Sequence, residues 1–429
     1  MGLHGTVRNR VRRLLTHEAS IALERRVPSL EARFEGIEEL GLYLHVPFCR
    51  QICPYCPYNK ELYDPRAAER YAGAVVKEID AYRRLIGDRP VTSFYIGGGT
   101  PTTMLASGLG RILEHVARSF NMRCGIHMES HPDDLSPAGL DAIEALGVEH
   151  LSIGVEALQD HHLRALRRPY SADEVKTAVA RAVDRGFRCV NADFIFALPN
   201  QTMAEIEEAA WQLVELGVDQ VAAYPLFDFS YTRWPDVARK NGYRRHGVLQ
   251  RRRMLRVLER VFYGAEFERT SVWAFTRRGV PRYCSVTVPL YVGLGASGGS
   301  YLRDVFYLNT FHVSEYCRAL EEGRMPIALS MELTERMQMA GWLYWRIYET
   351  RFRKADFRKR FAREYDDVYG RPTRLLARLG LAKADNGQVV LSDAGAYWLH
   401  ALEDLFSLDY VDKLWGQSKH DPWPERVVL

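Results

Sequence analysis

Short apolar runs alternate with longer amphipathic segments from about residue 40 to residue 265. The apolar runs are nearly continuous, which is typical of parallel strands covered on both faces. They predict strands at GLYLHVP (41–47), VTSFYIGG (91–98), CGIHMES (124–130), HLSIGVEAL (150–158), RCVNADFIFALP (188–199) and DQVAAYPLFD (219–228). The segments between them repeat apolar residues with helical period and predict helices at 65–87, 109–120, 141–148, 174–186 and 203–217.

This alternation predicts an α/β fold in which a parallel sheet has its helices outside. About six such units fit a partial (β/α)6, TIM-like barrel better than one mononucleotide-binding half. After about residue 270 the pattern changes to extended, glycine-rich sequence that we expect to lead away from the barrel. The expected domains are an N-terminal helical extension (1–38), the barrel (39–300), a connecting segment (301–330) and a C-terminal helical domain of winged-helix type with a small hairpin (331–429).

Composition narrows the class of protein. The 429 residues are 47% hydrophobic, and no run approaches the roughly 20 apolar residues of a membrane span. The N-terminus is basic but lacks the apolar region of a secretory signal, so we expect a cytoplasmic protein. A formal net charge of +4 gives no indication of nucleic-acid binding. A winged-helix domain does not imply DNA binding either, unless it has a basic recognition helix.

Three of the seven cysteines, Cys49, Cys53 and Cys56, share the window HVPFCRQICPYCPYNK with C-x3-C-x2-C spacing. A cubic iron–sulfur cluster normally takes four thiolates, so three local ligands would leave one iron free for a non-protein partner. Structural zinc is the main alternative, but it usually takes two C-x2-C pairs or cysteines with histidines. Here the second pair is missing, and the side chain of His45 could face either side of its strand. The other four cysteines are scattered, and Cys124 and Cys189 begin expected strands, where a buried structural role is favoured.

Other polar motifs also lie at the carboxyl ends of expected strands, where barrels place their chemistry. GGGTPT at 97–102 lets a ligand approach the backbone closely, and it lacks the pattern of a phosphate loop. Glu129, Glu156 and Asp193 are expected to converge on one mouth and to face a cationic, hydroxyl-rich ligand. Arg168 is either a solvated residue or a bidentate partner of a ligand carboxylate. His161 and His162 are expected at the surface without a catalytic role.

A second glycine motif, GLGASGGS at 293–300, matches G-x-G-x-x-G, the pattern of dinucleotide-binding loops. It lies late in the chain and no amphipathic helix follows it, so we expect a loop that closes one end of the substrate cavity.

With these motifs the chain resembles radical S-adenosylmethionine (SAM) enzymes, and among them the oxygen-independent coproporphyrinogen oxidase group. The resemblance runs from YLHVPFC through GGGTPT, LSIGVEAL and NADFIFALPNQT to the C-terminal domain. It implies that Cys49, Cys53 and Cys56 hold a 4Fe–4S cluster whose fourth iron is chelated by SAM. It also implies that reduction of this cluster cleaves SAM into methionine and a 5′-deoxyadenosyl radical.

The resemblance assigns further residues to the site. Those implied to line the SAM site are Tyr43, Tyr55, Gly98, Gly99, Glu129, Arg168 and Ile195. Thr100, Glu156 and Asp193 match positions that face a second SAM or a substrate, and they are the candidate catalytic residues.

Two departures distinguish this chain from the porphyrinogen enzyme. Tyr58 stands where that enzyme has a further cysteine, and Glu156 stands where it has a glutamine. In addition, the stretch RYCSVTVPLYVGLG lacks the HN-x-x-YW motif of the related haem-chaperone branch. We therefore expect a radical SAM enzyme that modifies a specialised small molecule, by hydrogen abstraction or by methyl or methylene transfer to an unsaturated carbon with a second SAM. The alternatives are tetrapyrrole chemistry, either coproporphyrinogen III decarboxylation or haem opening, and a non-catalytic haem chaperone.

The expected partners follow from this function. They are a small-molecule substrate and an electron donor such as flavodoxin or ferredoxin, with no nucleic acid and no membrane. The C-terminal domain is expected to act as a lid over the cavity or as a dock for a carrier protein, and an accessory methyltransferase is a further candidate partner.

Overall fold

The computed structural model describes residues 3–18, 20–281, 289–385 and 387–429. Within these residues, six parallel strands form the barrel wall in the order β10-β9-β8-β7-β5-β2. Their bounds are β2 (Leu40–Val46), β5 (Pro90–Gly98), β7 (Ile126–Ser130), β8 (Val148–Glu156), β9 (Cys189–Phe196) and β10 (Gln220–Pro225). The predicted partial (β/α)6 barrel is confirmed, and each predicted strand overlaps an observed one.

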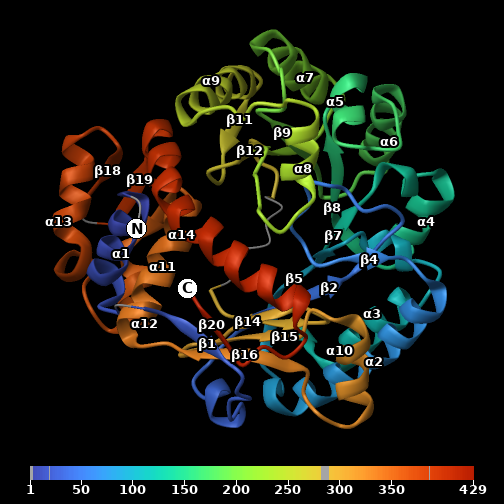
Figure 1. Ribbon diagram of the computed structural model, residues 1–429, viewed down its shortest axis with the longest axis vertical. Coiled ribbons are helices and arrows are strands. Elements are labelled where there is room, and N and C mark those ends of the chain that lie inside the picture. The colour runs from blue at the N-terminus through green and yellow to red at the C-terminus, as the bar shows by residue number, and fades with distance from the viewer. Residues whose placement is uncertain (1–2, 19, 282–288, 386) are drawn as a thin grey trace.

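Helices cover the outer side of these strands, as Figure 1 shows. They are α2 (Pro65–Ile86), α3 (Leu109–Ser119), α4 (Pro137–Ala145), α5 (Asp160–Ala165), α6 (Ala172–Asp184), α7 (Met203–Glu215) and α9 (Val248–Gly264). The short helix α8 (Trp234–Lys240) follows β10 and is not part of this outer layer. Local sequence defines their starts: Asp64 caps α2 before Pro65, and Ser171 and Thr202 open α6 and α7 with capping boxes. Apolar side chains of strands and helices then form one large core between the two layers.

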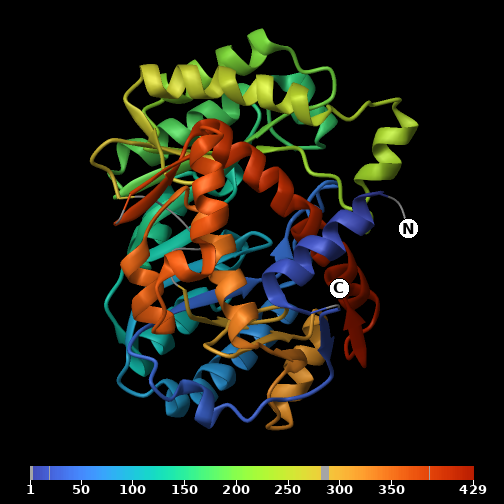
Figure 2. The same ribbon diagram turned by 90° about the vertical axis from the view of Figure 1, so that its left-hand side faces the viewer.

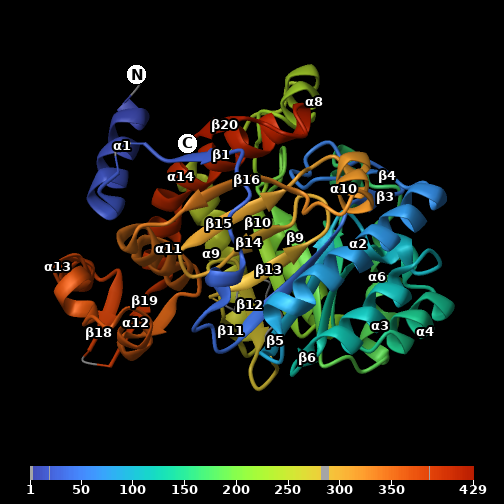
Figure 3. The same ribbon diagram turned by 90° about the horizontal axis from the view of Figure 1, so that it is seen from below.

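The glycine-rich segment after residue 290 does not lead away from the barrel, contrary to the sequence-based expectation. β13 (Tyr291–Leu294) pairs in parallel with β2, so a late segment extends the first edge of the barrel sheet. The sheet continues through antiparallel strands, which Figure 3 shows side by side. These are β14 (Gly299–Tyr301), β15 (Val305–Asn309), β16 (Ile327–Glu332), β1 (Ala22–Glu24) and β20 (Arg426–Val428).

The expected loop at GLGASGGS is a buried turn between β13 and β14. Gly295, at φ +92°, donates its N–H to Glu78 of α2 at 2.8 Å, and the N–H of Ala296 reaches the Tyr71 hydroxyl at 3.0 Å. A Cβ atom on Gly295 would lie 2.6 Å from the carbonyl oxygen of His45. These glycines therefore allow the turn to pack against α2 and the end of β2.

The opposite end of the sheet is antiparallel, where β12 (Ala274–Arg277) pairs with β10 and β11 (Phe267–Arg269) pairs with β12. Shorter strands lie outside this path. They are β6 (Asn121–Met122), which pairs with β5, and the isolated pair β3 (Phe48–Cys49) and β4 (Glu61–Leu62).

The C-terminal region packs helices around a small three-stranded sheet. Its elements are α11 (Glu335–Tyr348), β17 (Arg351–Arg353), α12 (Lys354–Phe361), α13 (Tyr365–Arg378), β18 (Ala382–Ala384), β19 (Gln388–Leu391) and α14 (Asp393–His420). The preceding helix α10 (Val313–Glu321) packs instead against α2 of the barrel. Trp342, Phe357 and Tyr365 form an aromatic core of their own here. α1 (Leu3–Thr16) lies against α11 and α14 (Figure 2), and Arg12 donates to the carbonyl oxygen of Leu429 at 2.7 Å.

α14 crosses the centre of the view in Figure 1 and ends beside the cysteine loop. Asp412 accepts the Ser230 N–H at 2.9 Å, and the Trp415 ring lies 5.9 Å from that of Tyr58. No helix among the described residues has the length and apolar content that a membrane crossing needs.

Candidate functional site

The cysteine loop follows β2 at the carboxyl end of the barrel strands. Cys49 ends the short strand β3, and the Cys56 N–H bonds to the Cys53 carbonyl oxygen at 3.4 Å. Cys49 is buried, whereas Cys53 and Cys56 are half-buried. The three thiols are therefore held on one compact loop, as a shared metal centre requires.

The thiol surroundings fit an iron–sulfur cluster. The Thr100 hydroxyl donates to Cys49 Sγ at 3.4 Å, which is the kind of contact that tunes ligating sulfurs. Burial raises the pKa of Cys49 to about 12 and also raises that of Cys53, so metal binding must displace their protons. Of the other cysteines, Cys189 and Cys317 are buried in the core and Cys124 is half-buried, while Cys284 lies outside the described residues.

His45 is not a free metal ligand, because both of its ring nitrogens have partners. Nδ1 lies 2.8 Å from the Tyr43 hydroxyl, and Nε2 lies 2.8 Å from the Asn59 carbonyl oxygen. Burial lowers the pKa of His45 to about 4, so the ring is neutral. It therefore fastens the cysteine loop to β2 instead of completing a zinc site.

The glycines at the end of β5 make close contacts that larger residues could not make. Gly98 has φ +119°, and a Cβ there would lie 2.6 Å from the ring of His45. A Cβ on Gly99 would lie 2.7 Å from the carbonyl oxygen of Phe48. The strand end thus fits against the base of the cysteine loop, and the backbone remains open to a ligand.

Glu129, at the end of β7, is fixed by two donors. The Tyr95 hydroxyl donates to Oε1 at 2.5 Å, and the Gly98 N–H donates to Oε2 at 3.1 Å. Burial is the largest effect on this carboxyl and raises its pKa, which the two hydrogen bonds oppose. Glu129 therefore places an oriented acceptor beside the glycine backbone.

Glu156 and Arg168 form a buried ion pair. Their side chains are 13% and 8% exposed, and Arg168 Nη2 donates to Glu156 Oε1. The guanidinium lies 6.0 Å from the ring centre of Tyr55 and 5.6 Å from that of Tyr170. Arg168 is thus neither solvated nor without a partner. Burial raises the pKa of Cys53, and the charge of Arg168 partly opposes that rise.

Glu156 also has an unusual backbone conformation for a non-glycine residue, with φ +65°. It lies beside a register shift between β8 and β9, at the last residue of its strand. Positive φ in a side-chain-bearing residue is uncommon and is typically retained where surrounding contacts enforce it.

Asp193 is a half-buried residue in the middle of β9. Ser152 donates to Oδ2 at 2.9 Å, and Asn191 donates to Oδ1 at 3.0 Å. Burial, followed by the charges of Glu129 and Glu156, raises its pKa to about 8. The three acidic residues therefore do influence one another, and Asp193 is mostly protonated at neutral pH. Ile195 lies two residues farther along the strand and faces the same side.

Tyr58, which sequence comparison marked only as a departure from the porphyrinogen enzyme, has its hydroxyl near the same carboxylates. The residue is 47% exposed, but burial of its hydroxyl, followed by the charges of Glu129, Cys56 and Asp193, raises its pKa. Four further residues shape the site through contacts with its side chains and could not be found from the sequence. They are Ser152, Asn191, Tyr95 and Tyr170.

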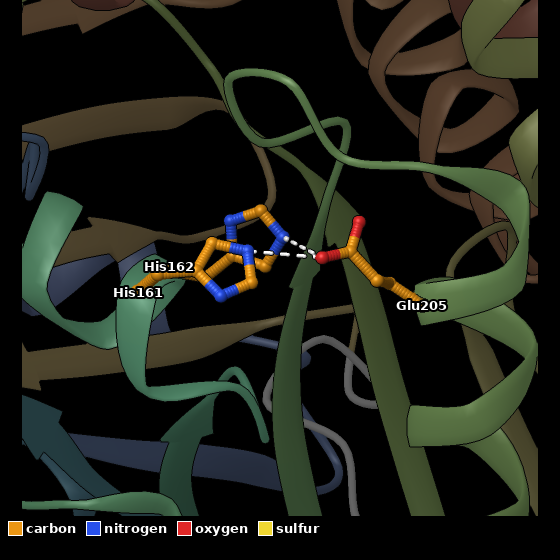
Figure 4. A group of neighbouring side chains, drawn as sticks. All are labelled: His161, His162 and Glu205. Atoms are coloured by element: carbon orange, nitrogen blue, oxygen red, sulfur yellow. Dashed lines mark ion pairs between the residues drawn. The ribbon is translucent and has the colours of Figure 1, made fainter.

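The expectation for the paired histidines is half wrong. His161 is exposed, but the side chain of His162 is 2% exposed, and both rings face Glu205. This group, shown in Figure 4, lies on α5 and at the start of α7.

Comparison with known proteins agrees with this geometry. Residues 43–211 match the family model of the Radical SAM superfamily. The heme chaperone HemW of Bacillus subtilis is 24% identical over 360 residues, covering 82% of this chain and 95% of the chaperone. The oxygen-independent coproporphyrinogen III oxidase of Pseudomonas aeruginosa is 25% identical over 404 residues, covering 86% of this chain and 85% of the oxidase.

Among solved structures, coproporphyrinogen III oxidase (HemN) from Escherichia coli superposes with a TM-score of 0.76 at 20% sequence identity. The match covers 90% of this chain and 94% of that one. It therefore shows that the barrel and the C-terminal region share one overall fold with that structure.

Proposed function

Because residues 43–211 form a radical SAM domain, we propose that the chain cleaves SAM reductively and removes a hydrogen atom from a small molecule of the tetrapyrrole class. The observation that supports this substrate class is the match of 82% of the chain to a haem chaperone and of 86% to a coproporphyrinogen oxidase. Methyl transfer has no such support from the relatives.

In this proposal Cys49, Cys53 and Cys56 hold the 4Fe–4S cluster that the family implies. When bound, the reduced cluster supplies the electron that cleaves SAM into methionine and a 5′-deoxyadenosyl radical. The chain's own groups orient the cofactor: the fixed carboxylate of Glu129 suits its cationic amino group, and Arg168 suits its carboxylate. The half-buried Tyr43 and Tyr55 and the buried Ile195 supply apolar surface that keeps water out.

A second candidate is methyl or methylene transfer with a second SAM. The observation that favours it is the acidic interior, since burial and then the charges of Glu129 and Glu156 raise the pKa of Asp193. Such an interior suits a cationic sulfonium better than the carboxylates of a porphyrinogen. Thr100, Glu156 and Asp193 are the residues that would face the second SAM.

We also propose that an acidic one-electron carrier, such as flavodoxin or ferredoxin, docks beside the cysteine loop. A pocket of about 510 Å³ there is lined by Cys53 and Cys56 together with Lys60, Arg233 and Lys419. Lys60 Nζ donates to the Cys56 carbonyl oxygen at 2.7 Å, and Lys419 Nζ lies 4.5 Å from the Tyr231 ring centre. Positive charge next to the cluster ligands would steer an acidic partner to a short transfer distance.

Arg233→Glu tests this docking surface, because Arg233 is exposed. Cluster reduction by flavodoxin should slow at low salt, whereas reduction by dithionite should not change. Arg118→Glu on α3 is the matched surface control. Equal slowing with both reductants would mean that the substitution damages the cluster instead.

The main experiment assembles the cluster without oxygen, reduces it, adds SAM and quantifies adenosyl products by mass spectrometry, with coproporphyrinogen III or haem as substrate. We expect 5′-deoxyadenosine that increases with the tetrapyrrole. S-Adenosylhomocysteine beside it would favour methyl transfer, and stoichiometric haem binding without SAM cleavage would favour a chaperone. Cys53→Ala should lose the cluster and Cys124→Ala should keep it; a fully loaded Cys53→Ala variant would refute the assignment.

A further inference from the structure

Three potential metal ligands face one another away from the cysteine loop. His161 and His162 lie on α5, which follows β8, and Glu205 lies in the first turn of α7, which follows β9. Nε2 of His161 lies 2.9 Å from Glu205 Oε1, and Nε2 of His162 lies 3.6 Å from the same oxygen. All three candidate ligand atoms lie within 4.8 Å of one another (Figure 4).

The carboxylate of Glu205 is oriented by its own helix. Its Oε2 accepts hydrogen bonds from the N–H of Thr202 at 2.7 Å and from the Thr202 hydroxyl at 2.8 Å, which completes the capping box. Gln159 donates to the Glu205 carbonyl oxygen at 3.1 Å and fastens the start of α5 to α7. Oε1 is thereby directed at the histidines before any ion binds.

His162 provides an independent indication of a ligand. Its side chain is 2% exposed, and Nε2 has no hydrogen-bond partner among the described residues, since 3.6 Å to Glu205 exceeds hydrogen-bond length. A buried polar atom without a partner is costly and is uncommon in native proteins. Burial lowers the pKa of His162 to about 4, so the ring is neutral and can offer a lone pair.

We propose that His161, His162 and Glu205 bind a zinc ion that is separate from the iron–sulfur site. Two imidazole nitrogens and one carboxylate oxygen are a common zinc ligand set, whereas calcium and magnesium prefer oxygen alone. Tetrahedral zinc with bonds of about 2.0–2.1 Å holds its ligand atoms about 3.3 Å apart. The observed separations of 2.9 and 3.6 Å lie on either side of that value. Because His161 is 56% exposed, the ion can enter from solvent and a water molecule can take the fourth position.

The position of this site gives the ion a structural role in the barrel. α5 lies in the chain between Glu156 and Arg168, the two partners of the buried ion pair. The ion would join the segments that follow β8 and β9, which also carry Asp193. We therefore infer that zinc positions Arg168 without touching the reacting molecules.

The test uses the full chain with its cluster assembled, treated with a chelator and then titrated with zinc. We expect one zinc ion per chain at micromolar concentration, measured by elemental analysis beside iron. His161→Gln and Glu205→Gln should each weaken zinc binding by about 100-fold. Glutamine can replace glutamate in a capping box, so Glu205→Gln should leave α7 intact.

His115→Gln is the matched control, because His115 pairs with Asp80 at 2.7 Å without a second histidine. It should bind zinc like the parent chain. A triple alanine variant of the cluster cysteines identifies zinc that occupies vacant thiols. Zinc retained by the triple variant and lost from His161→Gln supports the site. Zinc lost from the triple variant and retained by His161→Gln, or binding at millimolar zinc alone, overturns it.

Discussion

The substitution Glu156→Gln removes one charge from a buried ion pair and keeps the side-chain shape. The two partners are 13% and 8% exposed, so solvent screens the pair little. Removing one partner of such a pair costs about 3–5 kcal/mol, because the other charge stays buried. A glutamine oxygen still accepts from Arg168, and a hydrogen bond to a charged group returns about 1.5–3 kcal/mol. We therefore expect a net loss of about 1–2 kcal/mol in the free energy of unfolding.

The same substitution should change ligand binding in the opposite direction. Arg168 would no longer have to leave Glu156 before it pairs with the carboxylate of SAM. The pKa of Asp193 should fall from about 8, because Glu156 is one of the carboxylates that raise it. A tenfold gain in SAM affinity corresponds to about 1.4 kcal/mol, which is within what release of the guanidinium can supply.

The assay combines urea unfolding with calorimetric SAM titration of the cluster-loaded protein. Glu259→Gln is the control, since Glu259 is also a buried carboxylate and pairs with two arginines, Arg252 and Arg269. It should lower the urea midpoint at least as much, because two buried charges lose their partner, and leave SAM affinity unchanged. If Glu156→Gln weakens SAM binding while the midpoint stays constant, Glu156 contacts the ligand itself and the reasoning is refuted.

Three further substitutions test other parts of the site. Asp193→Asn removes a carboxyl whose pKa is higher in the folded chain than in the unfolded one, so the parent loses stability as pH rises and the variant does not. The melting temperature of the variant relative to the parent should therefore grow from about pH 4 to about pH 8 and then level off, and parallel curves would contradict the pKa of about 8. Thr100→Val removes the hydroxyl that donates to Cys49 Sγ, so the reduction potential of the cluster should become more negative at equal iron content. A redox titration followed by electron paramagnetic resonance measures this potential, and an unchanged value would show that the contact does not tune the cluster. Gly98→Ala should lower the melting temperature and cluster content more than Gly147→Ala, because both have positive φ but a Cβ at Gly147 meets nothing within 4 Å; equal losses would refute the proposed clash.

The barrel could be predicted because its strands are continuous apolar runs. Errors arose where the backbone departs from the pattern: β9 ends at Phe196 although the apolar run continues, because Ala197 adopts φ +60°. α5 was missed because it has six residues and a mostly polar sequence. The pairing of β13 with β2 was not predictable, because nothing in the sequence of a short glycine-rich strand indicates which distant strand it pairs with.

Within the site, spacing indicated the cysteines and the glycines, but side-chain direction had to come from the structure. His161 and His162 differ because adjacent residues on a helix point about 100° apart, so one faces solvent and the other the interior. His45 could have faced either side of β2, and its two partners show which side it takes. Tyr58 has no local pattern that would place its hydroxyl near Asp193.

The pairing of β2 with β13 has a consequence for how the protein is made. β2 ends at Val46, directly before the cysteine loop, and its neighbour on one side begins at Tyr291. A ribosome that has synthesised only the six parallel strands from β2 to β10 therefore presents the cysteines beside an uncovered strand edge, which is a known route to misassembly. Cluster assembly should therefore give more correctly folded protein when it takes place after β13 has been translated. Expression in which elongation pauses before that strand should then yield more aggregate and less holoprotein.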